Sequence, residues 1–172
     1  MIPRVTEIIG EVLSGSQWMA DEFYLQRGTA VHACCALVLA HSEFTCDERI
    51  TGQVQACRNW MEMYKPEVLH IEERRTHKIY QYTGMPDLVC KINGKRTIVD
   101  WKASIAPTVN FQLGAYGLMF DCKYGMAVQL KEDGTFKTDG LVKMDIPGRK
   151  FLAILTVYKI KHELGLIKGG KE

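Results

Sequence analysis

The sequence predicts an α/β fold in which a mixed sheet of about five strands is flanked by helices. The order of periodic segments indicates this fold, because helices come first and are followed by a strand, a hairpin, a helix, a second hairpin and a last helix. The dipeptide Asn93-Gly94 between two apolar runs marks one tight hairpin, since both residues tolerate the positive φ of a type I′ turn. With 172 residues, 47% of them apolar, and no repeat or long linker, the chain is expected to form a single domain over residues 1–172.

The composition indicates a soluble protein of a reducing, intracellular compartment, which we expect to be the cytoplasm. The sequence has no apolar run long enough to span a membrane, and its first residues lack the charged-then-apolar layout of a signal peptide. The six cysteines form no CxxC pair and fall mostly within apolar patterns, so we expect reduced thiols and neither a zinc site nor disulfides. The net charge of +2 neither requires nor excludes a nucleic-acid partner.

Three helices are expected in the first part of the chain. Apolar residues at helical spacing predict a helix over residues 5–13, with Thr6 as its N-cap. The pair Gly28-Thr29 marks the start of a second helix that runs to about residue 41. A third helix over residues 47–65 ends before a proline.

His32 then falls in the first turn of the second predicted helix. There the positive end of the helix dipole disfavours the imidazolium and leaves the ring free to bind a metal. A lone histidine at such a position is also commonly a packing or capping residue, and the pattern leaves both interpretations open.

Residues 68–76 are expected to form a strand, with Leu69 and Ile71 on one face and Glu72 on the other. Glu72 can then join an acidic face, whereas a shift of one residue would bring Glu73 there instead. The two glutamates can equally be a solvated pair at the end of a strand.

The first hairpin, at Asn93, brings two carboxylates together. With a two-residue turn, Val89 faces Ile98 and Asp87 faces Asp100. Two unit charges about 5 Å apart repel by roughly 3 kcal/mol at an effective dielectric constant of about 20. Either one carboxylate holds a proton or a cation lies between them, and Mg²⁺ takes one or two carboxylates together with water and phosphate oxygens.

Lys102 lies two residues after Asp100 and therefore on the same face of the strand. The remaining hairpin positions are apolar on both faces, which is typical of interior strands, where an unpaired carboxylate is costly. We therefore favour a metal site that contains Asp87, Asp100 and Lys102. A surface aspartate pair flanked by a lysine stays the alternative.

The segments after this hairpin complete the predicted fold. Residues 110–120 have a helical pattern in which Gln112 and Tyr116 share one face, although both can be plain surface or core residues. A second hairpin joins residues 125–130 to residues 135–144. Pro147 starts a last helix, through about residue 164, whose residues at core spacing are Phe151, Ile154, Leu155, Tyr158 and His162.

Five short motifs, taken in order, resemble the PD-(D/E)XK nuclease superfamily. Within it they are most similar to RecB-like exonucleases, including small phage nucleases and the mitochondrial genome maintenance exonuclease, as is the opening segment from Pro3 to Ile9. The resemblance covers about residues 1–120 and implies a restriction-endonuclease-like core. The motifs are Gly28-Thr29-Ala30-Val31-His32, Glu72, Gly84-Met85-Pro86-Asp87, Asp100-Trp101-Lys102 and Gln112-Leu113-Gly114-Ala115-Tyr116.

The resemblance implies a site that holds Mg²⁺ or Mn²⁺. The implied ligands are the side chains of His32, Asp87 and Asp100 and the backbone carbonyl of Trp101. Lys102 matches the lysine that orients or activates the attacking water and steadies the developing charge on the phosphate.

Three more positions carry implied roles. Glu72 matches an acidic site residue on the preceding strand, with Glu73 as its alternative, and Gln112 and Tyr116 match a helix that positions DNA. Some relatives hold an iron–sulfur cluster with three cysteines near the C-terminus. Because no cysteine follows Cys122, we expect no such cluster here.

The implied activity is a metal-dependent deoxyribonuclease, most simply an exonuclease that acts on single- or double-stranded DNA with a free end. The same resemblance implies a role in recombination, repair or end processing, a phage or prophage origin, and recruitment by a recombination or replication protein. Two alternatives remain, a structure-specific endonuclease of the same fold and a non-cleaving DNA-binding or assembly module. The complete set of His, Asp, Asp and Lys argues against the second alternative.

Overall fold

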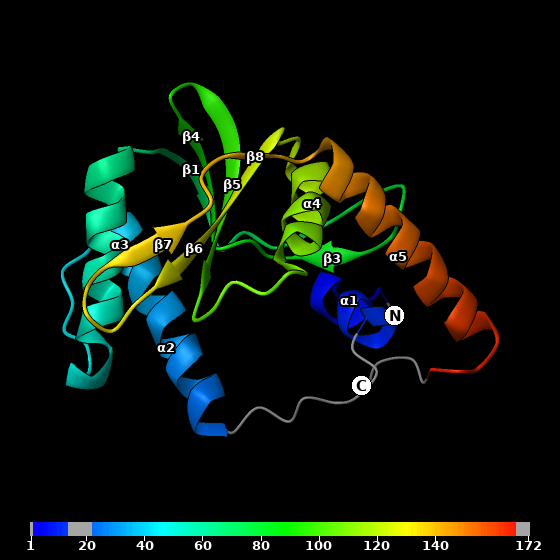
Figure 1. The fold of residues 1–172 in the computed structure, drawn as a ribbon, viewed down its shortest axis with the longest axis horizontal. Helices are drawn as coiled ribbons and strands as arrows, with labels where there is room; N and C mark the ends of the chain where they lie inside the picture. The colour runs from blue at the N-terminus through cyan, green and yellow to red at the C-terminus, as the bar shows by residue number, and fades with distance from the viewer. Residues whose placement is uncertain (1, 14–21, 168–172) are drawn as a thin grey trace.

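The computed structural model describes residues 2–13 and 22–167, and within them it has five α-helices, one 3₁₀ helix and eight strands (Figure 1). None of the helices described is both long and apolar enough to cross a membrane. The helices are α1 (Val5–Leu13), α2 (Glu22–Leu39), η1 (Glu48–Ile50), α3 (Thr51–Tyr64), α4 (Val109–Phe120) and α5 (Asp145–Glu163). The strands are β1 (Glu67–Ile71), β2 (Arg75–Thr76), β3 (Thr83–Gly84), β4 (Leu88–Ile92), β5 (Lys95–Lys102), β6 (Tyr124–Leu130), β7 (Phe136–Thr138) and β8 (Val142–Lys143).

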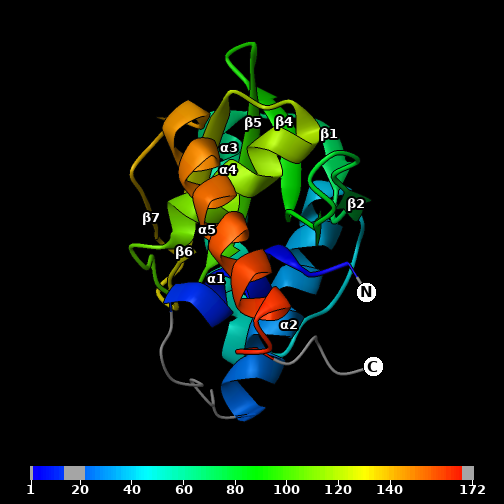
Figure 2. The ribbon, with the colours of Figure 1, turned by 90° about the vertical axis from the view of Figure 1, so that its right-hand side faces the viewer.

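The main sheet is covered by helices on both faces, which confirms the predicted α/β fold (Figures 1 and 2). Helices α2 and α3 pack on one face, where Trp60 and Trp101 meet edge to face with ring centroids 5.1 Å apart. Helices α1, α4 and α5 pack on the other face over Val89 and Ile98, and Figure 2 shows α5 running across α4 and α1. The strands between the two layers are apolar on both faces, as the sequence pattern predicts.

The strand order of the main sheet is β1-β4-β5-β6-β7, and β8 also pairs with β6. Strands β5 and β6 are parallel and are connected through α4, whereas the other pairs are antiparallel. Strands β2 and β3 form a separate antiparallel pair. The residues Asp100-Trp101-Lys102 therefore lie at the carboxyl end of a central strand, the edge at which open α/β sheets commonly bind ligands.

The hairpin at Asn93-Gly94 is confirmed, with φ of 50° and 75° at the two residues and the predicted register from Ile92↔Lys95 to Leu88↔Val99. The prediction that Asp87 and Asp100 form the next facing pair is wrong, because the ladder ends at Leu88. Pro86 has no N–H with which to extend it, and the N–H of Trp101 instead donates to Asp87 Oδ2 at 2.7 Å.

Two predicted features of the first helices are wrong. Thr6 lies inside α1, which begins at Val5, so it is not the N-cap. The second helix does not start at Gly28-Thr29, because α2 is already helical at Glu22. A glycine inside a helix costs only about 1 kcal/mol relative to alanine, and the helix continues through Gly28. His32 is consequently in the middle of α2, where the helix dipole does not hold its ring neutral.

The strand predicted over residues 68–76 is interrupted at Glu72, whose φ of 46° ends β1, and Arg75 then begins β2 in the smaller sheet. A register shift between Val68 and His70 also changes the faces of β1. As a result, Leu69 packs on the core below α4 and Ile71 packs on the opposite core, so the prediction that they share a face is wrong.

The second half of the chain follows the prediction closely. The predicted helix over residues 110–120 is confirmed as α4, and the last helix buries Phe151, Ile154, Leu155 and Tyr158 as expected. His162 is exposed, so its predicted core position is wrong. The strand predicted over residues 135–144 divides into β7 and β8 around Gly140, whose φ of 77° is unsuited to an extended strand.

Candidate functional site

A cavity of about 650 Å³ opens between α1, α2, α4 and the carboxyl end of β5. Seven of the residues singled out in the sequence line it, although they come from five separate segments of the chain. These residues are His32, Glu72, Asp87, Asp100, Lys102, Gln112 and Tyr116. The structure therefore brings together the side chains that the motifs predicted to act together.

Asp100 and Lys102 lie two residues apart on β5 and face the cavity together, as the strand periodicity requires. Lys102 Nζ forms an ion pair with Asp100 Oδ2, and the Asp100 side chain is only 4% exposed. Burial raises the pKa of Asp100, and the nearby charge of Asp87 raises it further, while Lys102 and His32 act in the opposite direction. A buried acid with a raised pKa beside a second carboxylate is typical of functional sites.

Asp87 uses both carboxylate oxygens. Its Oδ2 accepts a hydrogen bond from the Trp101 N–H at 2.7 Å, and its Oδ1 lies 2.7 Å from Nδ1 of His32 on α2. Burial lowers the pKa of His32, but the hydrogen bond with Asp87 and the charges of Asp87 and Asp100 outweigh burial, so the pKa is raised. The first-turn position predicted from the sequence would instead have lowered the pKa of His32, because the helix dipole there disfavours the imidazolium.

Two residues of helix α4 extend the network of polar contacts from Lys102 away from the carboxylates. Lys102 Nζ donates to Gln112 Oε1 at 3.0 Å, and Gln112 Nε2 donates to the Tyr116 hydroxyl at 3.0 Å. The predicted shared face of Gln112 and Tyr116 is thus confirmed. A Cβ at Gly84 would lie 2.5 Å from Cε1 of Tyr116, so the glycine of the Gly84-Met85-Pro86-Asp87 motif lets β3 approach this ring.

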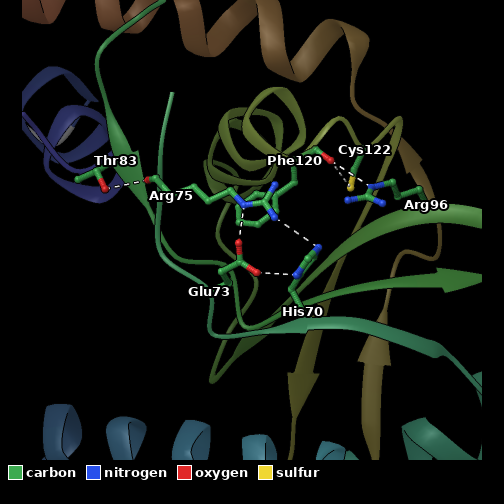
Figure 3. A network of polar contacts seen from close by, with 7 residues as sticks. All are labelled: His70, Glu73, Arg75, Thr83, Arg96, Phe120 and Cys122. Atoms are coloured by element: carbon green, nitrogen blue, oxygen red, sulfur yellow. Dashed lines mark hydrogen bonds and ion pairs between the residues drawn. The ribbon is translucent and has the colours of Figure 1, made fainter. Parts of the chain in front are cut away.

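The two glutamates at the end of β1 turn in different directions. The Glu72 N–H donates to the Asp87 carbonyl at 3.1 Å, and burial and the charge of Asp87 raise the pKa of the Glu72 carboxyl. Glu73 is held elsewhere, by His70 Nδ1 at 2.5 Å and Arg75 Nε at 2.6 Å (Figure 3). Of the two alternatives, Glu72 is therefore the one that lines the cavity.

The contacts around Glu73 explain why the bend at Glu72 is stable. Figure 3 shows the Arg75 guanidinium over the Phe120 ring, 4.2 Å from its centroid, while the Thr83 hydroxyl donates to the Arg75 carbonyl. Arg75 thereby joins the end of β1 to β3 and to the end of α4. A positive φ at a residue other than glycine persists only when its surroundings hold it, and these contacts do so.

Arg4 and Arg74 also line the cavity, and sequence reasoning did not assign them to the site. Both lie beside segments that the sequence singled out, since Arg4 belongs to the opening segment and Arg74 follows the glutamate pair. The signal that could have found them is their charge, because an arginine adjoining an acidic site is a common phosphate contact.

The predicted ligands His32, Asp87 and Asp100 share the cavity but are not grouped around one point, and Trp101, the fourth predicted ligand, lines a neighbouring cavity instead. Among the residues described, no three His, Cys, Asp or Glu side chains form a cluster arranged to hold a metal ion. Instead His32 contacts Asp87, and Lys102 contacts Asp100. The kinds of donor, two carboxylates and an imidazole, do fit a divalent cation such as Mg²⁺ or Mn²⁺, whose binding would compete with these two contacts.

A scan against protein-family models gives no match, and a search of curated proteins gives none either. Among solved structures, the alkaline exonuclease LHK-Exo from Laribacter hongkongensis has a TM-score of 0.56 and 9% sequence identity, over 94% of this chain and 88% of its own. A crystal structure of LHK-Exo in complex with dAMP gives a TM-score of 0.56 and 10% identity, over 95% and 88% of the two chains. The chain thus shares the fold of LHK-Exo, in agreement with the fold implied by its motifs.

Proposed function

We propose that this protein is a divalent-metal-dependent deoxyribonuclease that degrades DNA from an end. The main support is that three residues from the five sequence motifs lie together in one cavity, at the carboxyl end of a central strand. These residues are Asp87, Asp100 and Lys102. The fold is shared with an exonuclease that has been crystallised with a deoxynucleotide, which is the expected product of such a reaction.

The residues proposed to hold Mg²⁺ or Mn²⁺ are His32, Asp87, Asp100 and the Trp101 carbonyl. A bound divalent ion supplies a water of lowered pKa and stabilises charge on the phosphate. The carboxylate of Asp100 is buried, and this would strengthen its attraction to the ion, because charges interact more strongly where water is excluded.

Lys102 is placed to act on the reacting phosphate. Its ammonium group has three donors, of which one faces Asp100 and one reaches Gln112, so its orientation is restrained from two sides. A cation restrained in this way can hold the attacking water and stabilise negative charge that develops on the phosphate. Gln112 and Tyr116 restrain Lys102 and border the space in which the DNA strand would lie.

The proposed activity is tested with end-labelled linear DNA and a closed circle, each single- and double-stranded, in the presence of Mg²⁺, Mn²⁺ or EDTA. We expect the wild type to degrade only linear DNA and only with a metal, and Asp100→Asn to be inactive under every condition. Cutting of the circle would indicate an endonuclease instead. Binding of DNA without any cutting would indicate a non-cleaving module and overturn the proposal.

The two glutamates give a matched pair of variants. We expect Glu72→Gln to slow cleavage by about tenfold or more, because it removes a carboxyl group from the cavity beside Asp87. Glu73→Gln keeps an acceptor oxygen for Arg75 Nε, so we expect the bend at Glu72 to persist and the cleavage rate to fall less than in Glu72→Gln. Single-turnover rates measure both, and equal loss in the two variants would contradict the assignment of Glu72 to the site.

We also propose that the protein contains no iron–sulfur cluster, because residues 123–172 contain no cysteine that could supply the three C-terminal ligands. Protein purified without oxygen is expected to show no absorbance band near about 400 nm and no iron by elemental analysis. For its role in the cell we propose the processing of DNA ends in recombination or repair, with a recombination or replication protein as recruiting partner.

A further inference from the structure

A second cavity, of about 490 Å³, adjoins the first, and Gly28, His32 and Lys102 contribute to the linings of both. It lies between α2, α3, the carboxyl ends of β5 and β6, and the turn at residues 131–133. Its volume is within the range of cavities that bind small organic molecules. His32, Trp101 and Lys102 have roles in the proposed function, whereas the other residues of this lining have none.

The wall formed by the turn is fixed against α3. A Cβ at Gly52 would lie 1.8 Å from the carbonyl oxygen of Glu132, so the helix and the turn are in direct backbone contact. Arg27 on α2 reaches Glu132 across the opening, with Nη1 2.7 Å from Oε1. The cavity is therefore bounded by α2, α3 and the β6–β7 turn, which contact one another.

The lining combines apolar walls with polar and charged groups. Val31 and Leu130 are buried apolar residues, and Trp101 contributes further apolar surface. The charges of Arg27 and Glu132 are paired, and the other charged residues of the lining include Lys102, Lys131 and Asp133. Purine and pyrimidine bases combine apolar faces with hydrogen-bonding edges, and such a mixture of walls is typical of their binding sites.

One polar group in this lining is unsatisfied. Gln53 on α3 is 5% exposed, and within the described part of the chain its Oε1 has no hydrogen-bond partner. A buried carbonyl oxygen without a partner is costly, and in a native protein such a group calls for an explanation. A ligand with an N–H donor would supply the missing partner.

We propose that this second cavity binds the base of the nucleotide whose phosphate lies beside Lys102, and that Gln53 Oε1 accepts a hydrogen bond from it. This inference rests on the proposed nuclease function. Each base can donate this bond, adenine and cytosine from an exocyclic amino group, guanine from its amino group or N1–H, and thymine from N3–H. The bond is therefore expected to tighten the binding of every base by roughly three- to tenfold.

The test compares the wild type with Gln53→Met, which keeps the length of the side chain and removes the amide. The matched control is Gln55→Met, on the exposed side of the same helix. Because Gln53 Oε1 has no partner to lose, Gln53→Met is expected to fold with an unchanged or higher melting temperature. Calorimetric titration with dAMP, dCMP, dGMP and dTMP measures binding in each protein.

We expect the wild type and Gln55→Met to bind each of the four nucleotides about three- to tenfold more tightly than Gln53→Met does. Unchanged affinity of Gln53→Met for all four nucleotides would overturn the proposal, as would a wild type that binds none of them. If Gln53→Met melts at a lower temperature, Gln53→Glu replaces it. That variant keeps an acceptor oxygen and is expected to retain the affinity of the wild type.

Cleavage assays separate this inference from the proposed function. Mononucleotide binding that Gln53→Met weakens, without any DNA cleavage by the wild type, would overturn the nuclease and leave the base site in place. Metal-dependent cleavage together with equal nucleotide affinity of the wild type and Gln53→Met would overturn the base site alone.

Discussion

Replacement of Lys102 by alanine is expected to lower the rate of DNA cleavage by about 10²- to 10³-fold while leaving metal-dependent DNA binding nearly intact. The ammonium group of Lys102 contacts the polar side chains of Asp100 and Gln112. Its loss therefore removes a positive charge from the proposed reacting centre and leaves the apolar core in place. Single-turnover cleavage measures the first effect, and fluorescence anisotropy with labelled DNA measures the second.

The control for this variant is Lys91→Ala on the neighbouring strand of the same hairpin. Lys91 is exposed and pairs with Glu67 at 2.8 Å, away from the cavity, so its removal is expected to change neither rate nor affinity appreciably. If Lys102→Ala lost binding to the same degree as cleavage, Lys102 would be a ground-state phosphate contact and not a residue that acts on the transition state.

The largest expected effect on stability is that of Gly114→Ala. Gly114 is buried on α4 where α5 crosses it, and a Cβ there would lie 2.4 Å from the Pro147 carbonyl carbon and 2.5 Å from the Gly148 nitrogen. These atoms belong to backbone and cannot turn aside as a flexible side chain would. We expect a loss of roughly 3 kcal/mol in the free energy of unfolding, which denaturant titration measures.

Gly10→Ala is the matched control for this variant. Gly10 is also inside a helix, α1, but a Cβ there would have no atom within 4 Å. Alanine restricts the unfolded chain and favours the helix, so this variant is expected to gain about 0.5–1 kcal/mol. An unfolding midpoint of Gly114→Ala equal to that of the wild type would show that α4 and α5 do not pack this closely.

The parts of the fold that sequence predicted well are those controlled by local chemistry. The Asn93-Gly94 turn set the register of the central hairpin, because only such residues accept two successive positive φ angles at little cost. The last helix followed from Pro147 and the apolar spacing after it, although α5 already begins at Asp145. The prediction of a core position for His162 failed because the apolar spacing continues beyond the part of α5 that packs on the core.

One failure arose where distant contacts decide the conformation. The bend at Glu72 depends on Arg75, Phe120 and Thr83, of which only Arg75 is near it in sequence, so local propensity cannot report it. The start of α2 was missed for a different reason, because glycine and threonine are common at helix starts but can also lie inside a helix that begins earlier.

For the site, sequence identified which residues meet but not how they pair. Asp100 and Lys102 could be grouped from strand alternation and Asp87 from its place at the end of the hairpin, whereas His32 and Gln112 could be added only from the resemblance to known motifs. The contacts of Asp87 with His32 and of Asp100 with Lys102 depend on the placement of α2 against β5. The second cavity had no sequence signal, because Gln53 is unremarkable in a helix until its surroundings are known.

The distance along the chain between the members of the site affects when it can form. His32 and Asp87 are 55 residues apart, and Lys102 reaches them only once α2 has docked on a sheet whose parallel β5–β6 pair closes through α4. Contacts between distant residues form late in folding, because they require closure of long loops. A growing or partly unfolded chain would therefore lack the assembled site, and cleavage activity would appear together with the native core.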